Sequence, residues 1–327
     1  MLQQLKKIDP FIAGLIIMLI LAWAIPFEGE LKATIPLKTI IYWGVSGIFF
    51  LYGLKLDLKK IKEDMMNWKL HLTIQSTTFL LFPLIVLIFY PFFKNSSYEE
   101  LWMATFFLAV LPSTVSSSVV MISIAKGNLP AGIFNASISG LIGLFLTPLW
   151  MSVFMRTRDT GNTFSSLTEQ LFLQILLPVI VGLLLNYIFG NFVRKHSKTI
   201  SWFDKIIIFL IVYKSFSSAF TTGMFEEIVS STIITLSALM IVLFALVFII
   251  VSKVSKKLKF SIQDQITAIF CGSKKSLVHG SVFVTLIIPD LALQSLYLLP
   301  IMIYHAFQLF FTSYIARKWA KSSSSMN

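Results

Sequence analysis

Ten apolar runs, each about as long as a lipid bilayer is thick, constrain this chain more than any other feature. A helix needs about 20 apolar residues to cross a bilayer, and short connections separate the runs. Only 13% of the 327 residues are charged, against about 25% in soluble domains. We therefore expect an all-α polytopic membrane protein with spans at residues 10–27, 36–55, 69–92, 101–125, 129–154, 169–190, 202–223, 229–252, 262–288 and 294–317.

Lys and Arg are distributed unevenly between the two sides that these spans define. Of the 27, nineteen lie on the side that holds both termini, five on the opposite side and three within spans. Cytoplasmic loops carry an excess of Lys and Arg, so we expect both termini in the cytoplasm and the protein in the plasma (cytoplasmic) membrane, with the lipid bilayer as its partner. A nucleic-acid partner is not expected, because the lysines do not gather on one soluble surface.

A short pattern near the N-terminus recurs in the middle of the chain. Five spans separate the two copies, and an odd number gives them opposite topology in the membrane. Inverted repeats are typical of secondary transporters, which bind substrate near the bilayer midplane where helices are broken. We expect a first repeat in residues 1–158 and a second in 159–327 of one integral membrane unit. The matching positions are Pro10, Ile12, Gly14 and Leu15 against Pro178, Ile180, Gly182 and Leu183.

Polar residues concentrate in the fourth span of each half. Pro112–Ser118 holds five hydroxyl residues among seven. Proline removes a backbone hydrogen bond, and hydroxyls can satisfy the freed groups in lipid. By itself this pattern fits either a kinked helix whose serines bond its own carbonyls or a binding site. The corresponding span carries Gly272–Ser276, so we expect both spans to be broken and to form a transporter site.

Two lysines, Lys274 and Lys275, lie inside an apolar segment of membrane length. An ionisable residue at membrane depth is costly and by default marks a functional site. The alternative is that a long side chain reaches the membrane surface, which we consider chiefly for Lys275. Neighbouring helical residues point about 100° apart, so at least one of the two should face a polar cavity.

Other side chains are weaker candidates for the same site. Small-residue packing is an alternative for Ser137 and Ser139. The histidines lack a nearby carboxylate or a second close histidine, so no metal site is expected. The spans contain no paired aspartates, zinc motif or Ser/His/Asp set, so no enzyme is expected.

Together, the strong and the weaker candidates form one predicted substrate- or ion-binding site. Its residues are Ser117, Ser118, Lys274, Gln75, Asn135, Ser273, Ser116, Lys275 and Gly272.

Several short motifs, weak individually, are fairly specific in their order and spacing. They are Phe49–Leu56, Gln75 with Pro83, Pro112–Ser118, Gly127-Asn128, Phe270–Leu277 and Tyr304–Gln308. With them the chain resembles the bile acid:sodium symporter family, and more closely its bile-acid-symporter-like branch, over nearly its whole length. The resemblance implies ten helices in an inverted five-plus-five repeat, a panel domain and a core domain, with helices four and nine unwound and crossing.

The resemblance also implies sodium ligands, and here the chain departs from the family. Family serine and asparagine ligands would map onto Ser117 and Ser118, and a glutamine onto Gln75, but a glutamate and a glutamine are replaced by Phe270 and Lys274. At about 4 Å and an effective dielectric of 20, an ammonium repels Na⁺ by about 4 kcal/mol, or roughly three decades in affinity. Lys274 is then expected to supply the positive charge that an anionic substrate needs.

These observations predict a secondary active transporter that moves a small organic anion by shifting one helix bundle against another, with no cofactor. Either Na⁺ or H⁺ remains open as the coupling ion, since burial favours the neutral form of an amine and a buried lysine titrates readily. The alternative is a membrane regulator that transports nothing and modulates calcium or envelope-precursor homeostasis, as relatives in this branch are suspected of doing.

Overall fold

The computed structural model describes residues 10–28, 34–56, 67–155, 172–224 and 230–324, and all regular structure in these ranges is helical. An all-α fold is therefore confirmed for the described part of the chain. Two compact units are formed, each from several stretches of sequence. Unit 1 contains Met1–Leu56, Asp159–Ser230 and Ser281–Leu298, whereas unit 2 contains Asp57–Arg158, Ser231–Gly280 and Leu299–Asn327. The predicted repeat boundary at 158/159 lies outside the described residues.

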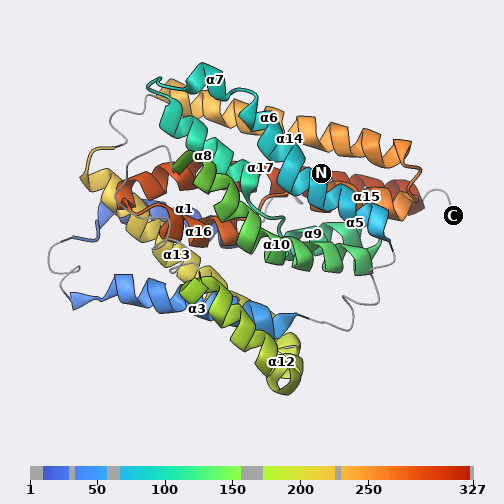
Figure 1. The fold of residues 1–327 in the computed structure, drawn as a ribbon, viewed down its shortest axis with the longest axis horizontal. Helices are drawn as coiled ribbons and strands as arrows, with labels where there is room; N and C mark the ends of the chain where they lie inside the picture. Colours follow the sequence, from blue (N-terminus) through green and yellow to red (C-terminus); the bar gives the residue numbers. More distant parts are fainter. Residues whose placement is uncertain (1–9, 29–33, 57–66, 156–171, 225–229, 325–327) are drawn as a thin grey trace. The chain divides into compact units, whose positions relative to one another are not determined.

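Unit 1 is built on two pairs of packed helices. Helix α3 packs along α12, and α1 packs along α13 (Figure 1). Proline in the first turn and basic residues in the last turn of α12 suit the two ends of a helix. The helices are α1 (Pro10–Ala24), α3 (Leu37–Lys55), a π-helical turn η3 (Phe172–Leu176), α12 (Leu177–Lys195) and α13 (Ser197–Thr221), joined by the end of α16 (Leu277–Ile287) and the start of α17 (Leu291–Ser324).

Glycines allow the backbones of α3 and α12 to touch. A Cβ atom at Gly53 would collide with the carbonyl oxygen of Val179, and one at Gly182 with that of Phe50. Asn186 then reaches across from α12 and donates to the carbonyl oxygen of Leu54 at 2.7 Å. The close contact therefore depends on the absence of side chains at these two positions.

Unit 2 contains the remaining helices, and α15 packs against both α5 and α10 (Figure 1). The start of α15 is capped by Ser261, whose hydroxyl accepts from the backbone N–H of Asp264 at 3.1 Å. The helices are α5 (Trp68–Ser76), a π-helical turn η2 (Thr77–Leu81), α6 (Phe82–Leu87), α7 (Tyr90–Phe93), α8 (Glu99–Val110), α9 (Ser116–Ile124), α10 (Leu129–Met155), α14 (Ser230–Lys257) and α15 (Ile262–Gly272), with the larger part of α17.

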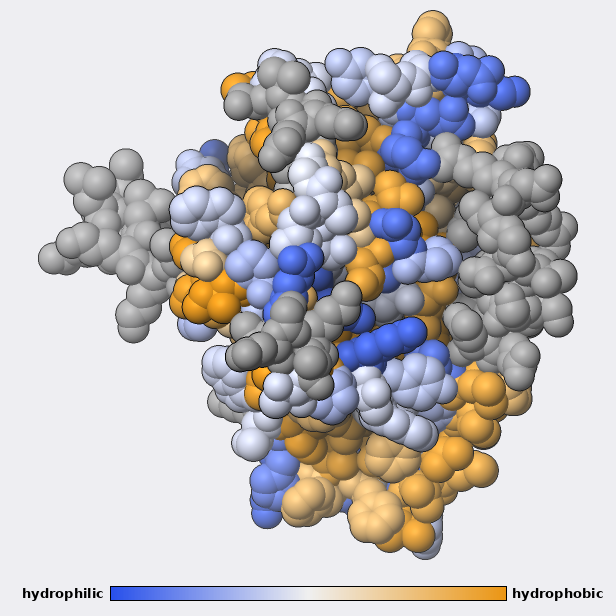
Figure 2. Space-filling model, turned by 90° about the vertical axis from the view of Figure 1, so that its left-hand side faces the viewer, coloured by the Kyte–Doolittle hydropathy of each residue, from blue (hydrophilic) through white to orange (hydrophobic). Residues whose placement is uncertain are grey.

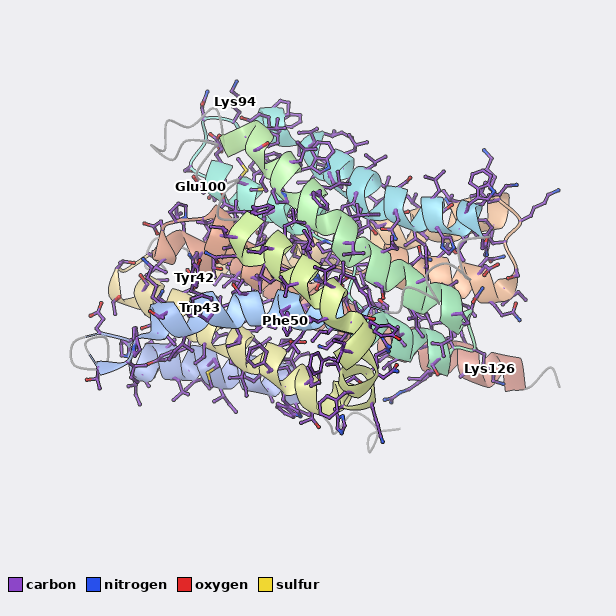
Figure 3. The ribbon with its side chains drawn as sticks, turned by 60° about the horizontal axis from the view of Figure 1, so that its bottom comes forward. Tyr42, Trp43, Phe50, Lys94, Glu100 and Lys126 are labelled. Atoms are coloured by element: carbon purple, nitrogen blue, oxygen red, sulfur yellow. The ribbon has the colours of Figure 1, made fainter. Side chains whose placement is uncertain are left out.

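Many large apolar side chains lie on the surface, as expected of a protein embedded in lipid. Trp43, which projects from α3 together with Tyr42 (Figure 3), is 68% exposed, and Leu184 is 74% exposed. Figure 2 shows apolar side chains covering wide areas of one face, most clearly in its lower part. Within unit 2, the charged residues Lys94 and Glu100 lie at one end and Lys126 at the other (Figure 3). This distribution fits an apolar zone between polar ends.

Six described helical segments are long and apolar enough to cross a membrane: Leu37–Lys55, Trp68–Leu87, Leu129–Phe154, Phe172–Lys195, Ser231–Lys257 and Leu291–Ala320. The other four predicted spans are helical too. The first is shorter, at Pro10–Ala24, the seventh contains Asp204, Lys205 and Lys214, and the fourth and ninth are each divided into two helices. The structure thus agrees with a polytopic membrane protein, while the ten-span inverted repeat stays a prediction.

The glycine contact between α3 and α12 gives a test of packing. Alanine favours a helix over glycine by about 1 kcal/mol, yet we expect Gly53→Ala to lower the melting temperature of the detergent-purified protein, because overpacking costs about 1–3 kcal/mol. Gly47→Ala on the same helix is the control, since its Cβ would lie 2.9 Å from the ring edge of Phe203, a partly exposed side chain that can move. Equal melting temperatures for the two variants would contradict the close approach.

Candidate functional site

Proline divides the helix of the fourth predicted span. Helix α8 ends at Val110 and α9 begins at Ser116, inside the run of hydroxyl residues. A residue before proline is pushed away from helical angles, and Leu111 accordingly has φ −68° and ψ 151°. Pro112 also lacks the N–H that would continue the helix. The break is therefore explained by local sequence.

The ninth predicted span is divided in the same way but without a proline. Helix α15 ends at Gly272 and α16 begins at Leu277. Ser273 directs its hydroxyl back to the carbonyl oxygen of Ile269 at 2.7 Å. A Cβ atom at Gly272 would lie 3.4 Å from a methyl group of Thr77, which is ordinary contact, so space alone does not require glycine there.

The two breaks bond to each other within unit 2. Ser113 donates its hydroxyl to the carbonyl oxygen of Cys271 at 2.6 Å, and Ser118 donates to that of Phe270 at 3.1 Å. In return, the backbone N–H of Ser276 donates to the carbonyl oxygen of Pro112 at 2.9 Å. The last carbonyls of a helix have no partner inside it, so the serines of one break satisfy the end of α15.

Lys274 lies between the breaks and contacts Ser117. Its ammonium donates to the carbonyl oxygen of Ser117 at 2.9 Å and approaches the Ser117 hydroxyl at 3.4 Å, which is itself bonded to Thr114 at 2.7 Å. The side chain of Lys274 has no exposed surface. No carboxylate among the described residues pairs with it. One residue thus supplies both acceptors for an ammonium that can donate three hydrogen bonds.

Lys275 is held in a different environment. Its ammonium donates to three backbone carbonyl oxygens, those of Thr78 at 2.7 Å, Ala109 at 2.6 Å and Leu111 at 2.8 Å. The side chain has no exposed surface. The alternative in which Lys275 reaches the membrane surface is therefore wrong for this structure.

Gln75 and Asn135 form a separate polar group where α5 meets α10. The Gln75 amide donates to the Asn135 side-chain oxygen at 3.2 Å, and the Asn135 amide lies 2.8 Å from Nδ1 of His71. The side-chain oxygen of Gln75 is buried and has no partner among the described residues. These two predicted residues contact each other rather than Lys274.

The structure thus brings Lys274 together with Ser117, and Ser113 and Ser118 together with the end of α15. Ser116 is the first residue of α9, and its side chain lies outside the described part. Ser139, for which packing was the alternative, is buried and accepts from the backbone N–H of Ser113 at 2.9 Å. Its hydroxyl therefore completes the break rather than filling space alone.

Two residues that support the break in α15–α16 were not among the candidates. Tyr304 donates its hydroxyl to the carbonyl oxygen of Ser273 at 2.7 Å. The Gln308 amide accepts from the backbone N–H of Lys275 and donates to its carbonyl oxygen, both at 2.8 Å. Both residues belong to a motif already noted in the sequence, which was the available signal, although the motif did not indicate what they bind.

Removal of the Gln308 amide tests this clamp. We expect Gln308→Met to destabilise the protein, because it leaves a buried N–H and a buried carbonyl without partners, at about 1–3 kcal/mol for each group. The measurement is the melting temperature in detergent. Gln265→Met is the control, since among the described residues the Gln265 side chain bonds the nearby carbonyl oxygen of Phe260, at 2.8 Å. If Gln308→Met melts no earlier than the control, the clamp does not hold the break.

Known proteins are similar to this chain over nearly its whole length. The family model described as the SBF-like CPA transporter family matches residues 9–321. An uncharacterized protein of Pseudomonas aeruginosa, PA2026, is 34% identical over 96% of this chain and 93% of its own length. YfeH of Escherichia coli is 30% identical over 99% of this chain and 97% of its own. The sodium/bile acid cotransporter 7-B of Xenopus laevis is 28% identical over 94% and 90%.

The match covers both breaks and all the candidate residues. It places the chain among integral membrane transporters rather than enzymes, and a small-molecule substrate follows from that. This protein belongs to the SBF-like CPA transporter family.

Proposed function

We propose that this protein is a secondary active transporter that carries a small organic anion across the plasma membrane by alternating access. The observation that carries the proposal is the buried ammonium of Lys274, which bonds a single one of the described residues at a point where two helices are broken. A desolvated cation with unused donor capacity favours an anionic partner. Ser117, beside it, would contact the same ligand.

The wider architecture belongs to the same proposal. Ten spans form an inverted repeat of residues 1–158 and 159–327, with broken helices four and nine crossing and both termini in the cytoplasm. Unit 2, which contains both breaks, acts as the core domain, and unit 1 acts as the panel domain. Movement of one helix bundle against another exposes the site to each side in turn.

In this proposal, the polar side chain of Gln75 lines the path of the substrate. Its buried side-chain oxygen lacks a partner among the described residues, and an unmatched buried acceptor costs about 1–3 kcal/mol. A hydroxyl or amide group on the substrate, or a bound water, would satisfy it. A substrate with a hydrogen-bond donor is therefore one way to satisfy this oxygen.

The proposed coupling ion differs from the ion in the printed name of one relative. The name of the Xenopus protein points to Na⁺, whereas Lys274 places an ammonium 2.9 Å from the Ser117 carbonyl oxygen. A sodium ion near that oxygen would be repelled by about 4 kcal/mol at 4 Å and an effective dielectric of 20. We favour H⁺ as the coupling ion, because a buried amine can exchange a proton during transport.

Uptake into proteoliposomes tests the role of Lys274. We expect saturable uptake of an organic anion, with a bile acid as the first probe, to fall at least about tenfold in Lys274→Ala, because a hydrogen bond to a charged group contributes about 1.5–3 kcal/mol. Lys256→Ala removes the same charge from an exposed position on α14 and should leave uptake unchanged. Equal uptake by both variants, with matched melting temperatures, would contradict the proposal.

Ion replacement tests the coupling. We expect uptake to continue when choline replaces Na⁺ and to respond to an imposed pH gradient, since no sodium ion is needed beside Lys274. Initial rates under separate Na⁺ and H⁺ gradients give the answer. A strict requirement for Na⁺ that is the same in wild type and Lys274→Ala would show that sodium binds elsewhere and that Lys274 is not in its place.

A further inference from the structure

Three backbone carbonyls that lost their helical partners surround the ammonium of Lys275. The first belongs to η2, where the N–H of Phe82 bonds the carbonyl oxygen of Thr77 in the wider π register. The next nitrogen in that register belongs to Pro83, which has no N–H. The carbonyl oxygen of Thr78 is therefore left without a backbone donor, and Lys275 binds it at 2.7 Å.

The other two carbonyls lie where α8 ends. The helical donor for Ala109 would be the N–H of Ser113, but that group donates to the hydroxyl of Ser139 at 2.9 Å. Leu111 lies in the break before Pro112. Lys275 binds the carbonyl oxygens of both, at 2.6 Å for Ala109 and 2.8 Å for Leu111. The C-terminal end of a helix carries partial negative charge, so this end of α8 favours a cation.

The number of acceptors matches a charged amine. An ammonium donates three hydrogen bonds, and all three here go to carbonyl oxygens. The ring of Phe82 lies 4.2 Å from the nitrogen, measured to its centroid, and a cation over an aromatic face is stabilised further. Lys275 pairs with no carboxylate among the described residues. Oriented carbonyls alone are the ligands that ion-selective proteins offer to alkali cations.

The chain holds this ammonium in a fixed position. Lys275 is fully buried, and Gln308 binds both its backbone N–H and its carbonyl oxygen. We propose that the carbonyls of Thr78, Ala109 and Leu111 form a monovalent cation site that the chain fills permanently with its own lysine. With the lysine in this site, the structure at the two breaks does not depend on a bound alkali ion. Removal of the Lys275 side chain creates a binding site for K⁺ or an alkylammonium ion. This inference does not depend on the transported substrate.

Replacement of Lys275 in the full-length, detergent-purified protein tests the site without any substrate. Lys275→Ala removes the equivalent of n-propylammonium and leaves room for an ion, whereas Lys275→Met loses the charge but fills the space. We expect the melting temperature of the Ala variant to be several degrees below wild type in choline chloride. It should rise saturably when KCl or n-propylammonium chloride replaces choline at constant ionic strength. Wild type and the Met variant should show no such rise.

Each other outcome is decisive. A melting temperature of the Ala variant that does not depend on the cation, or an equal rise in wild type, overturns the proposal. If the Ala variant does not fold in any of the salts, the Met variant decides, with Lys256→Met as an exposed control. A Met variant as stable as that control shows that the carbonyls need no cation, whereas one that melts well below it supports the site. Failure of anion uptake leaves these results unaffected, so the two proposals fail separately.

Discussion

The backbone carbonyls at the end of α8 have no hydrogen-bond partners within the helix. Their need for partners determines the arrangement of a large part of unit 2. In a membrane interior no water is available to satisfy them, so each needs a partner from the protein. Val110 receives the hydroxyl of Thr147 from α10 at 2.8 Å, Pro112 receives the N–H of Ser276, and Ala109 and Leu111 receive the ammonium of Lys275. A single helix end therefore fixes the positions of α10 and of the break between α15 and α16.

Adjacent lysines at the second break take opposite roles because of what surrounds them. Lys275 has as many acceptors as its ammonium has hydrogens, so all its donors are bonded within the protein. Among the described residues Lys274 finds acceptors on Ser117 alone, and in the proposed function the rest of its hydrogen-bonding capacity serves the ligand. Tyr304 and Gln308 hold the backbone on either side, which keeps the two environments apart. In the proposed function, the fixed position of Lys275 would also hold Lys274 in place for its ligand.

The helical segments, six of them long and apolar enough to cross a membrane, the two breaks and the unusual lysines could be predicted from the sequence because these depend on local composition. Pro112 and the hydroxyls after it predict a broken helix wherever they lie in a membrane span. The environment of Lys275 was not predictable in the same way, because its acceptors are backbone atoms from residues 197, 166 and 164 positions away. A backbone carbonyl carries no side-chain signal, and only the fold shows which ones lack a partner.

The polar group around Asn135 shows a related limit. Gln75 and Asn135 were both candidates, but the bond to His71 depends on how α5 packs on α10. The π-helical turn after α5 was likewise not predicted. Its cause is nevertheless local: Thr77 and Thr78 direct their hydroxyls to the carbonyls of Thr73 and Ile74, and Pro83 follows. Hydroxyls that compete for helical carbonyls and a missing N–H together favour a wider turn.

The same contacts bear on the sign of the charge that the proposed ligand carries. Two buried ammonium groups lie at one break, and neither is paired with a carboxylate among the described residues. Serine hydroxyls that donate to carbonyls, as Ser113 and Ser118 do, keep lone pairs that can still ligate a cation, so the serines alone do not decide the matter. The lysines do, because at about 4 Å a like charge costs about 4 kcal/mol at an effective dielectric of 20 and an opposite charge gains as much. These contacts therefore support the proposal that the ligand beside Lys274 carries a negative charge.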